Sequence, residues 1–175
     1  GLVQDTLVAF TADHGEFGGQ FRAFYKGLPY EASCHVPMII RDPRAPAQGR
    51  RCDRATNNID LFSTFLSVAG TPLPHNIESR DLAPLVRGDE EAWDNRSLWK
   101  KGAQSFLVRD DDKLVRGEVG ENLVYEFYNL AVDPLEERNL VDDPDQLARV
   151  NRLRDELDAW HDEQDEKGRA RLAGF

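Results

Sequence analysis

The first constraint on the fold is a run of apolar and β-branched residues near the start of the chain. Residues 5–12 read Asp-Thr-Leu-Val-Ala-Phe-Thr-Ala, with Asp13 and His14 directly after them. Continuous apolar runs of this length are typical of strands buried on both faces, which occur in parallel sheets covered by helices. Residues 36–41 have the same character. We therefore predict that the two runs form neighbouring buried strands of an α/β sheet.

Two helices are predicted after these strands. Residues 58–69 have helical spacing, with Asn58 as the candidate cap and Gly70 as the stop signal. A shorter helix is predicted over residues 81–87. The longer helix would place four apolar side chains on one face, namely Ile59, Phe62, Phe65 and Leu66.

The pattern changes after the polar, acidic residues 88–95, so we predict two domains, 1–92 and 93–175. Three short β-rich runs at hairpin spacing predict an antiparallel meander over residues 105–109, 113–117 and 123–130. A long helix is predicted to start at Pro144 and to lie on the meander through the apolar stripe Leu147, Val150, Leu153, Leu157 and Trp160. The stripe fades after Asp162, where we expect the helix to fray.

Composition excludes several classes of function. The 175 residues carry 22 basic and 32 acidic side chains, a net charge of −10, which disfavours binding to nucleic acid or anionic membranes. No apolar stretch is long enough for a membrane span, and two cysteines are too few for a disulfide framework. The chain begins at Gly1 and runs at once into a strand pattern, so we expect an N-terminal portion to be missing; the localisation stays unknown.

The strongest local signal for chemistry is Asp13-His14-Gly15, which follows a buried strand directly. Ligands of open α/β sheets bind beyond the carboxyl ends of the strands. A carboxylate and an imidazole at such a turn can both ligate a divalent cation, and the glycine permits the turn. The same tripeptide also occurs as a mere turn.

Lys26 is the next candidate, as a point charge for a sulfate or phosphate oxygen, although a solvated loop lysine has the same sequence signature. Glu31 could cap a short helical turn over residues 30–33. Other candidates favour structural roles: residues 110–112 form an acidic hairpin tip that should face water, and His161 is expected on a solvated helix face.

Four segments of the chain form a recognisable series: residues 5–16, 26–31 with 35–41, 58–66 with 69–74, and 124–130 with 133–140. In this order they resemble the C-terminal part of a sulfatase of the alkaline-phosphatase superfamily. The resemblance implies the C-terminal part of a mostly parallel α/β sheet with helices, followed by a small antiparallel sheet packed by a long C-terminal helix. It also implies hydrolysis of a sulfate ester by a formylglycine nucleophile and a divalent cation, usually calcium, with Asp13 and His14 as metal ligands and Lys26 on the sulfate.

Two departures from the family pattern matter. The C/S-x-P-x-R motif that gives the formylglycine does not occur in the chain, so the nucleophile would lie in the missing N-terminal portion. Phe21 stands where many members have a histidine that lines the site, which leaves the substrate class open.

Three functions remain in competition. The first is a sulfuric ester hydrolase, the second a phosphonate monoester or phosphodiester hydrolase of the same superfamily, and the third a non-catalytic structural or interaction fragment. Half of a doubly wound sheet would leave apolar surface and an open strand edge exposed, so self-association of the chain is also expected.

Overall fold

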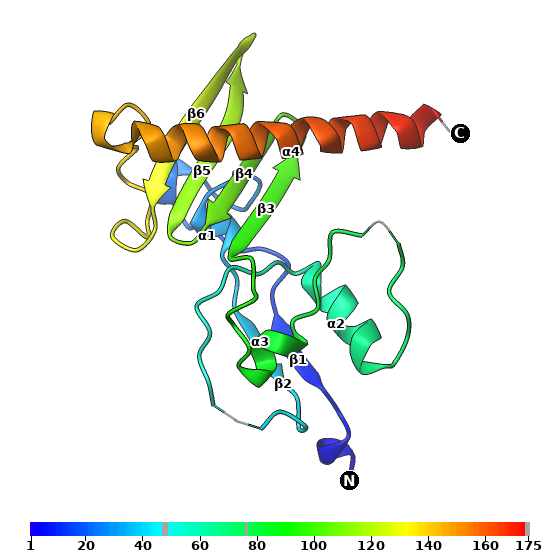
Figure 1. Cartoon of the computed structure of the whole chain (residues 1–175). Coiled ribbons are helices and arrows are strands. Elements are labelled where there is room, and N and C mark those ends of the chain that lie inside the picture. The colour runs from blue at the N-terminus through cyan, green and yellow to red at the C-terminus, as the bar shows by residue number, and fades with distance from the viewer. Residues whose placement is uncertain (47–48, 76, 174–175) are drawn as a thin grey trace. The chain divides into compact units, whose positions relative to one another are not determined.

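The computed structural model describes residues 1–46, 49–75 and 77–173 (Figure 1). The chain divides into two compact units. The first unit comprises Gly1–Lys26 and Ala32–Arg96, and the second comprises Gly27–Glu31 and Ser97–Phe175. The place of residues 27–31 in the second unit was not predicted from the sequence, and the domain boundary at 92/93 stays a prediction.

The first unit contains a two-stranded sheet of β1 (Val8–Thr11) and β2 (Met38–Arg41). The strands are neighbours, as predicted, but they pair antiparallel, with Val8 opposite Arg41. The expected burial on both faces is wrong for this chain, because Phe10 is 60% and Ile39 61% exposed. A ribbon of two strands cannot cover both of its faces without further strands or helices.

Helix α2 (Asp60–Val68) buries its polar side and exposes its apolar side. Ser63 and Thr64 are fully buried, and the Thr64 hydroxyl accepts a hydrogen bond from the Leu82 amide at 2.9 Å. Ile59, Phe62 and Phe65 are about half exposed.

The predicted cap of α2 is wrong, because Ile59 occupies the cap position and the Asn58 side chain bonds elsewhere. Its side chain donates to the Ala12 carbonyl at 2.8 Å and accepts from the Thr11 hydroxyl at 2.9 Å. Asn58 therefore fastens the end of β1. The shorter helix, α3 (Ala83–Arg87), lies within the predicted range, and α1 (Glu31–Cys34) is a single turn.

The second unit contains a four-stranded sheet in the order β3-β4-β5-β6 (Figure 1). Three of its strands match the predicted meander, and the pairs β4–β5 and β5–β6 are antiparallel. The strand β3 was not predicted; its Trp99 stacks on Phe106 of β4 with ring centroids 5.6 Å apart. The strands are β3 (Arg96–Lys101), β4 (Gln104–Arg109), β5 (Asp112–Val119) and β6 (Asn122–Asn129).

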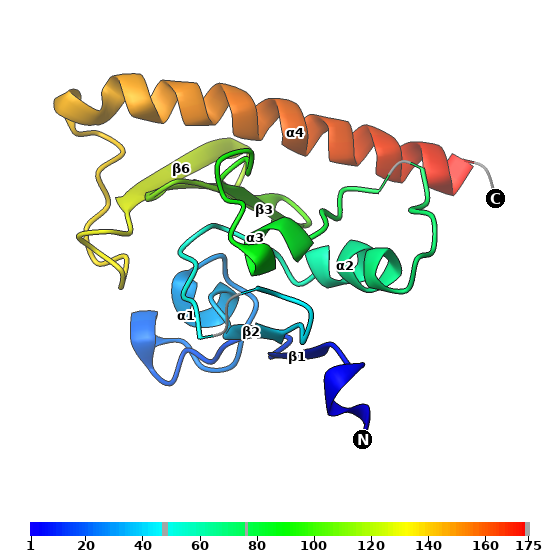
Figure 2. The same cartoon turned by 60° about the horizontal axis from the view of Figure 1, so that its bottom comes forward.

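Helix α4 (Leu147–Ala173) lies across one face of this sheet (Figures 1 and 2). The side chain of Asp143 accepts a hydrogen bond from the Asp145 amide at 3.0 Å and caps a 3-10 helix (Pro144–Gln146) that leads directly into α4, so the helical segment begins at the predicted Pro144. Leu147 is 47% exposed, against the prediction that it belongs to the buried stripe. The core between helix and sheet consists of Leu107, Leu114, Phe127, Val150, Leu153 and Leu157.

The expectation that α4 frays after Asp162 is wrong, because the helix continues to Ala173. Ion pairs replace apolar contacts in this last part of α4. Lys167 Nζ lies 2.8 Å from Oε1 of Glu163, one turn earlier in the helix, and Asp165 Oδ1 lies 3.1 Å from Nζ of Lys100 in β3. Within the described parts of the chain, no helix combines the length and the apolar character that crossing a membrane requires.

Candidate metal- and anion-binding site

The turn after β1 presents a carboxylate and an imidazole next to each other. Asp13 Oδ1 accepts a hydrogen bond from the His14 amide at 3.1 Å, and His14 Nδ1 lies 2.6 Å from the Gly15 carbonyl oxygen. A carbonyl oxygen can only accept, so the neutral imidazole carries its proton on Nδ1. The lone pair of Nε2 is then left for a metal ion.

The three predicted site residues come together at one oxygen atom. Asp13 Oδ2 lies 3.5 Å from His14 Nε2 and 3.8 Å from Lys26 Nζ. The Asp13 side chain is 83% exposed and that of Lys26 is 54% exposed. The three side chains therefore form an open, charged surface in this chain.

Gly15 fixes the turn against the backbone of α1. Its amide donates to the Ser33 carbonyl at 2.8 Å. A Cβ atom at this position would lie 2.1 Å from the Ala32 carbonyl oxygen, which no side chain tolerates without a backbone shift. Glycine is thus required here by close approach rather than by an unusual dihedral angle.

The loop between His14 and Lys26 is held by Glu16, which the sequence analysis did not single out. Glu16 Oε1 accepts hydrogen bonds from the Tyr25 amide at 2.6 Å and from the Gly18 amide at 3.2 Å. The Phe17 amide donates to the Tyr25 carbonyl at 3.1 Å, and the Phe17 ring is buried. These contacts close the loop and bring Lys26 back to Asp13, from which it is separated by 13 positions in the sequence.

The same loop contains unusual backbone conformations. Phe21, Arg22 and Tyr25 all have positive φ angles, of 53°, 58° and 65°. Such conformations cost free energy for residues other than glycine and are concentrated at functional sites. Phe21 and Tyr25 are also 41% and 75% exposed. The residue at the histidine position of the family is thus an exposed aromatic ring on a strained loop.

Among the described residues, no group of three or more His, Cys, Asp and Glu side chains is arranged to hold a metal ion. Asp13 Oδ2 and His14 Nε2 are close enough to contact the same ion, so the pair fits part of a divalent cation site. Calcium takes six to eight ligands in general. The pair therefore needs further ligands from elsewhere.

Two sequence interpretations are corrected in the second unit. Asp112 does not face water, because it is buried and accepts hydrogen bonds from Arg149 of α4. His161 is only 3% exposed; its Nδ1 lies 2.8 Å from Ser105 Oγ, and its Nε2 contacts Lys100 Nζ. Ser105 is fully buried, so this Ser–His contact is out of reach of a substrate.

Burial is the first cause of the lowered pKa of His161, and the charges of Arg116 and Lys100 lower it further. Glu31 was predicted to cap a helical turn, and it is the first residue of α1, but its side chain also has a long-range partner. Its carboxylate accepts a hydrogen bond from Lys113 at 2.8 Å.

Comparison with known proteins identifies the family. The family model described as N-sulphoglucosamine sulphohydrolase, C-terminal, matches residues 19–163. The chain belongs to this family. Arylsulfatase K of Canis lupus familiaris is 30% identical to this sulfatase segment over 154 residues, which are 79% of the chain and 28% of the relative. The chain thus spans less than a third of the length of that relative.

Solved structures match the fold of the sulfatase segment. The phosphonate monoester hydrolase of Agrobacterium radiobacter has a TM-score of 0.79 and 28% identity, over 93% of this chain and 36% of that one. A protein solved with its substrate D-glucosamine-2-N,6-O-disulfate has a TM-score of 0.82 and 24% identity, over 95% of this chain and 36% of that one. The small antiparallel sheet with its long C-terminal helix is confirmed as the C-terminal part of the sulfatase fold.

Proposed function

We propose that the chain is the C-terminal part of a sulfuric ester hydrolase. In this role Asp13 and His14 contribute to a divalent metal site, and Lys26 binds an oxygen of the sulfate ester substrate. The observation that carries the proposal is the convergence of these three side chains on Asp13 Oδ2, directly after β1, in a chain of the sulfatase family.

Each side chain has a distinct task in the proposal. Asp13 brings negative charge to the cation, and His14 brings the lone pair of Nε2, held in direction by the contact of Nδ1 with Gly15. Calcium is the proposed ion, and it would supply positive charge that stabilises the sulfate oxygens in the transition state. Lys26 adds a second positive charge, from a side chain that can follow the shift of charge on the sulfate.

The nucleophile and the remaining ligands are proposed to come from the preceding portion of the same protein. The chain has no C/S-x-P-x-R motif, so the formylglycine would lie in that portion. It would cover exposed apolar side chains of the first unit, among them Phe10, Ile39, Phe62 and Phe65. Covering them would remove apolar surface from water.

A second candidate function is the hydrolysis of phosphonate monoesters or phosphodiesters. It is favoured by the likeness to the phosphonate monoester hydrolase of Agrobacterium radiobacter, which is also the more similar of the two structures in sequence. A cation and a lysine would serve a phosphoryl oxygen as well as a sulfuryl oxygen.

The test is a comparison of rates in the full-length parent protein. Rates with an aryl sulfate, an aryl phosphodiester and a phosphonate monoester are measured for the parent and for the Asp13→Asn and Lys26→Met variants. Asp53→Asn is the matched control, because the Asp53 side chain is 79% exposed and its ion pair is with Arg51, which is 89% exposed. Loss of about 10²-fold or more is expected for both site variants, with loss of bound calcium for Asp13→Asn alone.

The outcomes separate the three hypotheses. A preference for the aryl sulfate supports the sulfatase, and a preference for either phosphorus ester supports the second candidate. Full activity of Asp13→Asn would overturn the site assignment. An inactive parent whose preceding portion lacks the formylglycine motif would favour the non-catalytic fragment.

A further inference from the structure

The segment that follows Lys26 is held by a buried charge cluster. Residues Gly27–Glu31 belong to the second unit, whereas Lys26 before them and Ala32 after them belong to the first. Lys113 of β5 is fully buried, and its Nζ lies 2.8 Å from both Glu31 Oε1 and Glu136 Oε1. The segment is therefore attached to the small sheet through the side chain of Glu31.

Glu136 adds a second attachment to the same residue. Its carboxylate is 1% exposed, and Oε2 accepts a hydrogen bond from the backbone amide of Glu31 at 2.6 Å. One oxygen of Glu136 thus holds Lys113 and the other holds the segment backbone. Glu136 itself has a φ angle of 57°, a conformation that costs free energy for a residue other than glycine.

Tyr30 supplies a third attachment. Its hydroxyl donates to Glu126 of β6 at 2.9 Å, and the Tyr128 hydroxyl donates to the same carboxylate at 2.7 Å. The rings of Tyr30 and Tyr128 also pack edge to face, with centroids 6.5 Å apart. Burial, followed by the charge of Glu126, raises the pKa of Tyr30, so its hydroxyl keeps its proton and its role as donor.

The burial of Glu136 and Lys113 removes charged groups from water, which costs free energy. Burial raises the pKa of Glu136, and the charge of Lys113 opposes that rise. Buried ion pairs contribute little net stability compared with apolar groups of the same size. They do impose direction, because each hydrogen bond fixes the place of a particular atom. Here the atoms that are fixed belong to residues 30 and 31.

We propose that Glu136, Lys113 and Tyr30 are positioning residues for Lys26. They anchor the chain four and five residues after Lys26, and on the other side of Glu31 the chain is held at Ser33 by the amide of Gly15 in the metal turn. Only Gly27, with a φ angle of 112°, Leu28 and Pro29 separate Lys26 from the anchored residues. The anchor holds the backbone that follows Lys26 and so restricts the conformations open to the residue that carries the ammonium group.

The inference rests on the proposed function, and a double-mutant cycle in the full-length parent tests it. Glu136→Ala should lower kcat for the preferred ester about 10–100-fold, since a misplacement of about 1 Å can cost that much. In the Lys26→Met background the same substitution should cost less than about twofold, because the group that it positions is already gone.

Two further variants keep the test decisive. Tyr30→Phe removes only a hydroxyl and should show a smaller loss, of about 3–10-fold, with the same dependence on Lys26. Asp112→Asn is the matched control, because it weakens another ion pair of the second unit, between the buried Asp112 and the partly exposed Arg149, without changing residues 27–31. Its kcat should stay within about twofold of the parent at a temperature where it is folded.

The outcomes distinguish the two proposals. If Glu136→Ala and Tyr30→Phe lower kcat by the same factor in the Lys26→Met background as in the unaltered parent, the positioning role is overturned. A wild-type kcat in both single variants would overturn it as well. If Glu136→Ala does not fold, Tyr30→Phe decides alone. A Lys26→Met parent with wild-type kcat would overturn the assignment of Lys26 and the inference with it.

Discussion

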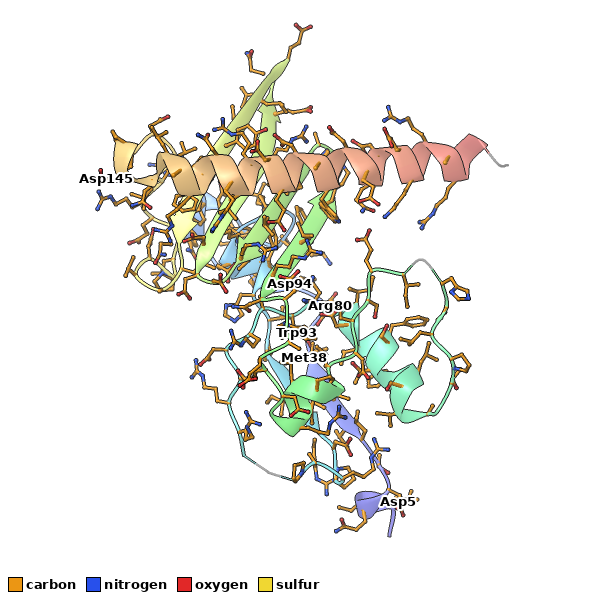
Figure 3. All side chains as sticks on the ribbon, viewed as in Figure 1. Asp5, Met38, Arg80, Trp93, Asp94 and Asp145 are labelled. Atoms are coloured by element: carbon orange, nitrogen blue, oxygen red, sulfur yellow. The ribbon has the colours of Figure 1, made fainter. Side chains whose placement is uncertain are left out.

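Arg80 encloses the buried carboxylate of Asp60. The Arg80 amide donates to Asp60 Oδ1 at 2.8 Å, Nη2 lies 3.2 Å from Oδ2, and Asp60 is 1% exposed. The guanidinium group also lies 4.1 Å from the ring centroid of Trp93 and donates to the carbonyls of Asp94 and Arg96 at 2.8 and 3.0 Å (Figure 3). One arginine thus joins α2 to the segment that leads into β3.

The first prediction concerns this ion pair. Asp60→Ala leaves a partly buried guanidinium without its carboxylate and two amides without an acceptor, so it should lower the free energy of unfolding by about 3–5 kcal/mol. The measurement is urea denaturation, with the m-value checked for a two-state change. Asp53→Ala, at an exposed carboxylate, should change stability by less than about 0.5 kcal/mol. Equal effects of the two variants would show that Asp60 is not structural.

The second prediction separates two leucines of the predicted helical stripe. Leu153 is fully buried between α4 and the sheet, whereas Leu147 is 47% exposed. Leu153→Ala should cost about 2–5 kcal/mol through lost burial and a cavity, and Leu147→Ala less than about 1 kcal/mol. Hydrogen exchange of the β5 and β6 amides, read with the denaturation curve, checks both. Similar losses would mean that the whole stripe is buried.

Local patterns predicted the second unit well and the first unit only in part. The spacing of Val150, Leu153 and Leu157 determines which side of α4 is apolar, and a sheet beside it can then be inferred. An apolar run such as that of β1 shows that a strand forms, but it carries no information on strand direction or on what covers it. The antiparallel pairing of β1 with β2, and the exposure of Phe10 and Ile39, were therefore not predicted.

The candidate site and the buried charges also differ in how far the sequence could predict them. Asp13 and His14 are adjacent in sequence, so their pairing follows from one turn, whereas the return of Lys26 depends on a loop with left-handed residues that no spacing rule predicts. The burial of Lys113 could not be read locally, because its partners Glu31 and Glu136 lie 82 and 23 residues away. Long-range charge pairing requires the fold to be known first.

The third prediction concerns pH. Burial, then Arg116 and Lys100, lower the pKa of His161, while Asp165 and Asp162 oppose the shift. The unfolded state then binds the proton more readily, so the stabilising contribution is complete above the unfolded pKa of 6.5 and is lost as pH falls through the lowered folded value. Stability should therefore decline from pH 7 toward pH 5, and His161→Gln should flatten this decline. A steeper decline in the variant would contradict the assignment.

The fourth prediction contrasts two glycines. Gly15→Ala would bring a Cβ atom to 2.1 Å from the Ala32 carbonyl oxygen, so α1 or the turn of residues 13–15 must move. It should destabilise the chain by about 1–3 kcal/mol and lower calcium affinity in the parent. Gly168→Ala meets no atom within 4 Å on the exposed side of α4 and should stabilise by about 0.5–1 kcal/mol. Thermal unfolding gives both signs, and a stabilising Gly15→Ala would contradict the close approach.

The last prediction concerns calcium binding by the 175-residue chain alone. Asp13 and His14 offer one carboxylate and one imidazole, and the described residues hold no larger ligand group. Lys26, 3.8 Å from the same carboxylate, further disfavours a cation there. Water would have to fill most of the coordination sphere, so the dissociation constant should be about 1 mM or weaker. Calorimetric titration of the chain beside its Lys26→Met variant measures this. Lys26→Met should bind calcium somewhat more tightly, because a repulsive charge is removed, and micromolar binding by the unaltered chain would show that its own residues complete the site.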